Sequence, residues 1–343
     1  MPEPSSFSLH TSSMPAITCL CPTYGRFGRL RQAVACFLLQ AYPNKRLLIL
    51  NDAPEPVILS TGLTITADQY LCGAEVRVIN WLARFKALGH KRQALLETAR
   101  TPLVAHWDDD DLYLPWHLSQ CVAALEDASF KVDGRSKDAN AANLPPSNFS
   151  LTSSRYHMVK PRGAWWALGS DDSFSVRGPC HNVFEGQVLF DRERALALGG
   201  YPPKVSGQAK ALIQKFKKAK EFHQFDPWPF ISYVYRWDDG LHHISGGGNN
   251  RKSHKAFGEK NTDFGAGKPL IPEGGDALEW ARETLRPLFT QFLDSLLLRT
   301  MVAPIGPMSD KSMRGKKTKR LSTPDYDAIK DRLLSYRWEA PLE

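Results

Sequence analysis

Four consecutive aspartates, Asp108, Asp109, Asp110 and Asp111, follow an apolar stretch over residues 102–107 in this chain of 343 residues. Adjacent carboxylates repel one another, so a folded protein that sets them directly after a buried strand has a cation to bind there. The first hypothesis is therefore a site for a divalent metal ion and for phosphate chemistry that depends on it.

Short apolar runs alternate with helical patterns along the first third of the chain. Leu30, Val34, Phe37 and Leu38 recur at the three- and four-residue spacing of one helix face, and residues 88–99 also predict a helix. Buried strands are predicted over residues 16–21, 46–50, 76–79 and 102–107. This alternation predicts an α/β fold, with one Rossmann-type, mostly parallel sheet flanked by helices and joined by right-handed crossovers.

Polar residues directly follow three of the predicted strands. These are Thr23 and Tyr24 after Pro22, the pair formed by Asn51 and Asp52, and the aspartate run. In open α/β sheets, ligands bind outside the carboxyl ends of the strands, so the three clusters would share one rim. Turn residues commonly follow strands, which alone would explain Asn51 and Asp52, but three clusters on one rim favour a binding site.

The second half of the chain has a less regular pattern. Residues 116–125 predict a helix, residues 133–154 a loop, residues 230–235 a strand, and residues 276–300 a helix that docks through one apolar face. Trp165, Trp166, Trp228 and Trp237 either stack on a sugar or fill the core. The acceptor of any reaction would be recognised in this half.

Charge and cysteine content indicate the surroundings of the protein. The net charge is +8, and much of the excess lies in residues 311–320, which form either a solvated linker or a contact with an anionic membrane. The 6 cysteines form no Cys-x-x-Cys pair, and Cys19 and Cys21 are expected in the core. No apolar run approaches the roughly 18 residues of a spanning helix. We expect a cytoplasmic protein, and peripheral contact with the inner face of the membrane is the alternative that the basic segment leaves open.

Together these motifs resemble family 2 glycosyltransferases of the GT-A fold over about residues 15–250. The segments that carry the resemblance are Cys21-Pro-Thr-Tyr-Gly-Arg26, Leu48-Ile-Leu-Asn-Asp52, Trp107-Asp-Asp-Asp-Asp111 before Pro115, Leu189-Phe-Asp-Arg192 and Gly199-Gly-Tyr-Pro202. The resemblance implies that Thr23, Tyr24 and Asp52 hold the base and ribose of a nucleotide. It also implies that Asp108 and Asp110 form an Asp-x-Asp motif, which holds Mg²⁺ or Mn²⁺ against a diphosphate.

Basic and imidazole side chains complete the expected site. Arg84, Lys91 and Arg92 are the cationic residues nearest in sequence that can share the phosphate charge, although a solvated surface role is open for each. His243 resembles the late histidine that completes the metal or phosphate site in relatives, with His242 as a rival. A structural role is open for either histidine.

One departure from the family pattern concerns the general base. Relatives present an acidic pair after the Gly-Gly-Tyr landmark, whereas residues 205–212 read Val-Ser-Gly-Gln-Ala-Lys-Ala-Leu here. Gln208 and Ala209 cannot accept the proton of an acceptor hydroxyl, so the base is Glu185, Glu221 or Asp226, or the alignment is displaced, or transfer is impaired. We expect Asp226. A missing base slows such a reaction by about 10²- to 10⁴-fold.

The resemblance leads to one functional expectation and a division of the chain. We expect a metal-dependent, hexosyltransferase-like and inverting glycosyltransferase, which uses a nucleotide sugar, a UDP-sugar first. The acceptor would be a glycan, a lipid-linked molecule or a small hydroxylic compound, and no nucleic-acid partner is expected. The expected parts are a disordered N-terminus (1–14), a nucleotide-sugar-binding half (15–115), an acceptor-binding half (116–250) and a helical C-terminal extension with the basic linker (251–343).

Two alternatives remain. A nucleotidyltransferase of related fold would carry a Gly-rich, basic loop after the first strand, for which Gly25-Arg-Phe-Gly28 is a thin match. A pseudoenzyme that binds nucleotide or glycan without turnover would explain the missing acidic pair.

Overall fold

The computed structural model describes residues 14–60, 65–66, 68–71, 74–81, 83–130, 154–169, 174–180, 185–227, 231–237 and 302–304. Several sequence expectations lie outside these residues. They are the N-terminal segment up to residue 13, most of the predicted loop over 133–154, Trp228, both candidate histidines, the helix over 276–300 and the basic segment. The domain division stays a prediction.

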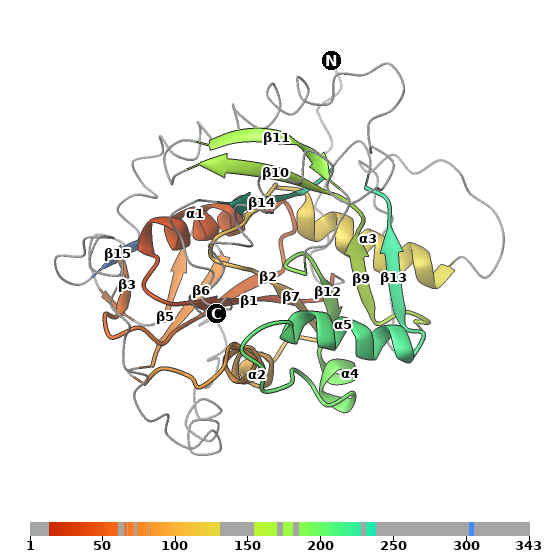
Figure 1. The fold of residues 1–343 in the computed structure, drawn as a ribbon, viewed down its shortest axis with the longest axis horizontal. Helices are drawn as coiled ribbons and strands as arrows, with labels where there is room; N and C mark the ends of the chain where they lie inside the picture. The colour runs from red at the N-terminus through yellow and green to blue at the C-terminus, as the bar shows by residue number, and fades with distance from the viewer. Residues whose placement is uncertain are drawn as a thin grey trace, which may run out of the picture.

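An eight-stranded sheet forms the centre of the molecule, with the order β13-β9-β12-β7-β1-β2-β6-β5 (Figure 1). Its four consecutive parallel strands are β7 (Leu103–His106), β1 (Ile17–Thr23), β2 (Lys45–Asn51) and β6 (Ala74–Asn80). These are the four strands predicted from the apolar runs. The predicted α/β class with a mostly parallel sheet flanked by helices is confirmed.

The remaining strands extend the sheet on both sides. They are β5 (Asp68–Leu71), β9 (Met158–Pro161), β12 (Leu189–Asp191) and β13 (Phe222–Phe225). Strand β12 runs antiparallel to β7, with Leu189 opposite Ala105. The residues just before β12 therefore lie beside the carboxyl end of β7, where the four aspartates begin.

Helices cover both faces of the sheet and enclose a core on each (Figure 1). Helices α1 (Phe27–Leu38) and α3 (His117–Phe130) lie on one face, and α2 (Leu88–Thr98), α4 (Arg192–Ala197) and α5 (Gln208–Lys218) on the other. Alternation along β1 divides its side chains between the cores, because Cys19 and Cys21 pack towards α1 and α3 and Leu20 packs towards α2. Both cysteines are free and buried, as predicted.

Two smaller sheets were not predicted from the sequence. One has the order β11-β10-β14-β8, with β8 (Leu112–Tyr113), β10 (Ala164–Gly169), β11 (Phe174–Cys180) and β14 (Tyr233–Trp237). The other joins β3 (Val57–Ser60) to β4 (Ile65–Thr66) and β15 (Val302–Pro304). Strand β8 directly follows the four aspartates and pairs with β14, so Tyr233 is brought to their side.

In the part of the chain that the structure describes, no helix combines the length and apolar character needed to cross a bilayer.

The start of α2 is packed tightly against the turn before α5. The Gly89 N–H donates to the Lys204 carbonyl oxygen at 2.9 Å, and a Cβ added to Gly89 would lie 1.9 Å from the Pro202 carbonyl oxygen.

We expect Gly89→Ala to lower the free energy of unfolding by about 3 kcal/mol, because backbone must move to relieve the overlap. Urea denaturation measures the free energy of unfolding. The control Gln214→Ala, at an exposed position of α5, should change that free energy by less than about 0.5 kcal/mol. Equal stability of Gly89→Ala and the wild type would contradict the packing described.

Candidate functional site

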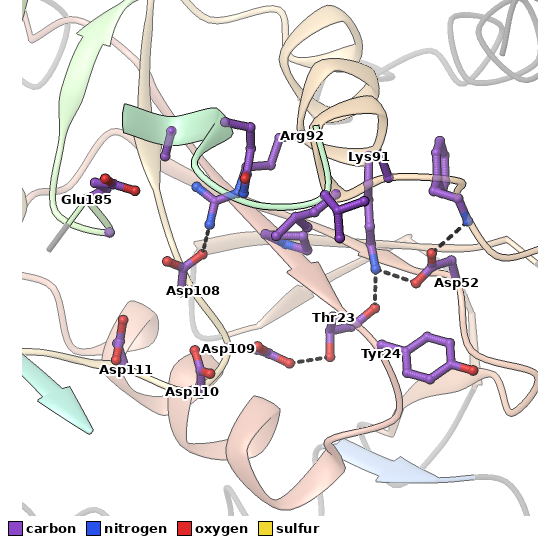
Figure 2. A pocket seen from close by; sticks show the side chains of 18 of the residues that line it. Thr23, Tyr24, Asp52, Lys91, Arg92, Asp108, Asp109, Asp110, Asp111 and Glu185 are labelled. Carbon is purple, nitrogen blue, oxygen red and sulfur yellow. Dashed lines mark hydrogen bonds and ion pairs between the residues drawn. The ribbon is translucent and has the colours of Figure 1, made fainter. Parts of the chain in front are cut away.

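One pocket lies where β1, β2 and β7 end, and it contains the three polar clusters that the sequence placed on one rim. Thr23 and Tyr24 line it from the end of β1, Asp52 from the end of β2, and the aspartates from the turn after β7 (Figure 2). The starts of α2 and α5 and residues 185–186 complete the lining. Parallel pairing explains this convergence, because it brings the carboxyl ends of the strands to one edge.

Arg26 bridges two of the four aspartates. Its Nη1 lies 2.5 Å from Asp110 Oδ2, its Nε donates to Asp109 Oδ2 at 3.2 Å, and its Nη2 pairs with the other oxygen of Asp109. Thr23 Oγ1 also donates to Asp109 Oδ2, at 2.6 Å. The Thr23 hydroxyl predicted to bind nucleotide is therefore bonded to the acidic turn. Arg26 was not predicted, although it directly follows the Pro-Thr-Tyr-Gly motif.

Arg92 holds Asp108 and lies beside the buried His106. Arg92 Nη2 lies 2.5 Å from Asp108 Oδ1. Nearby, His106 Nδ1 donates to the Glu185 carbonyl oxygen at 2.8 Å, and its Nε2 contacts the Tyr201 hydroxyl. Burial, reinforced by Arg92, lowers the pKa of His106 well below its ordinary value, so the imidazole is neutral. The neutral ring thus fixes the segment that carries Glu185 beside the end of β7.

Two tyrosines hold Asp111 and Gly186 in place at the pocket. Tyr233 donates its hydroxyl hydrogen to Asp111 Oδ2, and Tyr113 donates to the Gly186 carbonyl oxygen at 2.9 Å. A Cβ added to Gly186 would lie 2.6 Å from the Tyr233 hydroxyl and 2.9 Å from Asp108 Oδ2. Only glycine allows this close approach, a requirement that the sequence did not reveal.

Asp52 and Lys91 form a buried ion pair beside Thr23 (Figure 2). Lys91 Nζ lies 2.5 Å from Asp52 Oδ1 and also donates to the Thr23 carbonyl oxygen, while the Phe85 N–H donates to Asp52 Oδ2 at 2.9 Å. Burial lowers the pKa of Lys91, and Asp52 opposes that effect. Lys91 therefore ties β1 to β2, in addition to lining the pocket.

Arg84 lies over the ring of Tyr24, with its guanidinium carbon 4.0 Å from the ring centroid. Cation–π contact of this kind contributes about 0.5 to 1 kcal/mol at exposed sites and more where water is excluded. Both residues line the pocket, so one wall presents an aromatic ring and a fixed positive charge.

The acidic turn favours additional positive charge. Burial raises the pKa of Asp108 and of Asp109, and it outweighs the lowering by Arg92 and Arg26 respectively. Asp110 raises both pKa values further. A bound cation would relieve this cost of burying negative charge.

The donor atoms suit a hard divalent cation that is shared with a ligand. Carboxylate oxygens are the ligands that Mg²⁺ prefers, and one or two protein carboxylates commonly hold it together with substrate phosphates. No group of three or more His, Cys, Asp or Glu side chains among the described residues could hold a metal ion. Asp108 and Asp110 both line the pocket and could supply the one or two carboxylates that a cation shared with a phosphate ligand needs.

The structure does not bring the expected base to the pocket. Asp226 follows β13, is exposed, and is not among the residues that line the pocket. The physical reason is sheet order, since β9 and β12 separate β13 from β7. Glu221 does not line the pocket either, and its carboxylate pairs with Arg194 at 2.7 Å.

Gln208 and Ala209 occupy the first turn of α5 and line the pocket. The segment expected to carry the acidic pair therefore reaches the site without a carboxylate. Glu185 lines the same pocket from the residues before β12.

No family model and no curated protein matches the chain. Among solved structures it is similar to S. aureus TarS 1–349 in complex with UDP-GlcNAc, with a TM-score of 0.46 at 11% identity, over 67% of this chain and 61% of that one. It is also similar to the mannosyltransferase PcManGT from Pyrobaculum calidifontis in complex with GDP-Man and Mn²⁺, with a TM-score of 0.41 at 14% identity, over 68% and 60% of the two chains. This chain thus spans about three fifths of their length.

The Asp52–Lys91 pair predicts a measurable coupling. We expect Lys91→Met to destabilise the protein by about 3–5 kcal/mol, because it leaves a buried carboxylate without its ion pair. The double variant Lys91→Met with Asp52→Asn should recover part of that loss, since the Asn oxygen still accepts from the Phe85 N–H. Urea unfolding of the four proteins gives the coupling. Purely additive effects would contradict a direct buried pair.

Proposed function

We propose that this protein is a metal-dependent glycosyltransferase that moves a sugar from a nucleotide-diphosphate sugar to a hydroxyl acceptor. The observation that carries the proposal is the meeting of Thr23, Asp52 and the four aspartates with several cationic side chains in one pocket. Six carboxylates and five Arg or Lys side chains line it. A nucleoside diphosphate with a divalent cation matches that mixture of charges.

Two helix starts support the binding of phosphate. Leu88 in α2 and Gln208 in α5 both line the pocket. The residues before these helices, Ala87 and Gly207, make no side-chain cap hydrogen bond. Helix N-termini carry partial positive charge, which favours anionic ligands.

Nucleotide recognition would use the residues at the ends of β1 and β2. Thr23, Tyr24 and Asp52 are the proposed contacts for base and ribose, with a UDP-sugar as the proposed donor. Arg84 covers the Tyr24 ring and adds a positive charge beside it. Lys91 holds Asp52 in place, and we propose that it also contributes positive charge near the phosphates.

Asp108 and Asp110 would hold Mn²⁺ or Mg²⁺. A divalent cation there stabilises the negative charge that grows on the departing diphosphate, without a proton transfer. Arg26 and Arg92 place fixed positive charge beside the same carboxylates and would share that stabilisation. His243, which lies outside the described residues, remains a proposed third ligand.

The reaction would invert the anomeric centre by in-line attack of the acceptor oxygen. The acceptor remains a glycan, a lipid-linked molecule or a small hydroxylic compound. Cytoplasmic location, and contact of residues 311–320 with an anionic membrane, are proposals of the same kind.

A nucleotide- or glycan-binding protein without turnover is the second candidate. It is favoured by one observation, that Gln208 and Ala209 line the pocket where relatives carry the acidic pair.

Turnover of a panel of nucleotide sugars with Mn²⁺ tests the proposal. We expect release of a nucleoside diphosphate, and we expect Asp110→Asn to reduce metal-dependent release by at least about 10²-fold, because it removes a charged ligand. Glu193→Gln, a change of equal size on the surface, is the matched control and should behave as the wild type. Wild-type activity in Asp110→Asn would remove the metal claim.

The identity of the product separates the alternatives. Release of pyrophosphate from a nucleoside triphosphate and a sugar phosphate would indicate a nucleotidyltransferase. Binding of nucleotide sugar without product would indicate the non-catalytic candidate.

A further inference from the structure

Five of the six carboxylates that line the pocket are held by other side chains. Asp52 is paired with Lys91, Asp108 with Arg92, Asp109 and Asp110 with Arg26, and Asp111 with Tyr233. A carboxylate held in this way is oriented by its charged or hydroxyl partner and shares at least one oxygen with it, so it is less available to take a proton from a substrate hydroxyl.

The sixth carboxylate is that of Glu185. It makes no hydrogen bond or ion pair with any residue in the described parts of the chain, and it is only partly buried. Its backbone is fixed all the same, because His106 donates to its carbonyl oxygen and Tyr113 donates to that of Gly186. Among the described residues, Glu185 thus has an unpaired carboxylate on a backbone that hydrogen bonds hold in place at the pocket wall (Figure 2).

Among the described residues, the other positions considered for a base are less suitable. Gln208 and Ala209 reach the pocket but have no carboxylate, Asp226 is exposed away from it, and Glu221 is paired with Arg194.

We propose that Glu185 is the general base of the transfer reaction, an inference that rests on the proposed function. Glu185 takes the proton of the acceptor hydroxyl while the acceptor oxygen forms a bond to the anomeric carbon. The bond from that carbon to the phosphate oxygen breaks, and the diphosphate leaves with the bonding electrons. The protonated Glu185 then returns its proton to solvent.

The charges around Glu185 suit this role. Burial raises the pKa of its carboxyl group above the ordinary value of 4.5, and Asp108 adds a smaller raise. Arg92 from α2, Lys160 from β9 and Lys210 from α5 oppose that effect. A base whose pKa lies closer to the working pH removes a proton more effectively.

Hydrolysis of a donor tests the proposal without knowledge of the natural acceptor, because water takes the acceptor's place. We expect Glu185→Gln to lower kcat for diphosphate release from a UDP-sugar that the wild type hydrolyses by about 10²- to 10⁴-fold. The Kd of UDP with Mn²⁺ should be unchanged, since the substitution keeps the size of the side chain. The wild-type pH profile should show an acidic limb above the range of an ordinary glutamate, and the variant should lack that limb. Glu193→Gln is again the matched control.

Azide provides a second readout that loss of structure could not produce. Azide attacks without giving up a proton, so Glu185→Ala with sodium azide should form a glycosyl azide and recover diphosphate release. No azide product, with hydrolysis by Glu185→Gln equal to the wild type, would overturn the assignment. Loss of hydrolysis in Asp226→Asn but not in Glu185→Gln would overturn it as well. Absence of hydrolysis and transfer in the wild type would instead refute the proposed function.

Discussion

The balance of charge at the carboxyl ends of β1, β2 and β7 is the constraint on which the rest of the site depends. Three consecutive carboxylates, from the partly buried Asp108 to the buried Asp109 and Asp110, pair with two guanidinium groups in the described part of the chain. One guanidinium comes from Arg26, directly before α1, and the other from Arg92 in α2. Because burial still raises the pKa of Asp108 and Asp109, the turn is folded but short of positive charge. That shortage of positive charge is the physical basis for the cation and phosphate ligand that we propose there.

The architecture makes this arrangement possible. Central β1 lies between β2 and β7, and antiparallel β12 returns the chain to the end of β7. Two buried side chains then hold residues 185–186, just before β12, in place. The neutral His106 donates to the Glu185 carbonyl oxygen, and Tyr113 donates to the Gly186 carbonyl oxygen. The small sheet formed by β8 and β14 supplies Tyr233 to Asp111. Supports of this kind hold the polar groups of a site in one geometry.

Sequence patterns predicted the parts of the fold that depend on local order. The apolar runs that became β1, β2, β6 and β7 are continuous, and parallel pairing then places Thr23, Asp52 and the aspartates together without further information. The position of Asp226, the expected base, could not be predicted for the opposite reason, and it does not line the pocket. Whether Glu185 or Asp226 reaches the pocket depends on the order of β13, β9 and β12, which pair over long separations in sequence. The partners of Arg26 were equally hidden, because 83 residues separate it from Asp109.

Binding of a nucleoside diphosphate together with a divalent cation is the central claim. A thermal-shift measurement of the wild-type protein tests it most directly, since a ligand that binds only the folded state raises Tm. UDP and GDP would each be added alone, with Mn²⁺, and with excess chelator. We predict that a nucleoside diphosphate with Mn²⁺ raises Tm by more than the two separate shifts together. No shift with any combination, or a nucleotide shift that chelator leaves unchanged, would contradict the account.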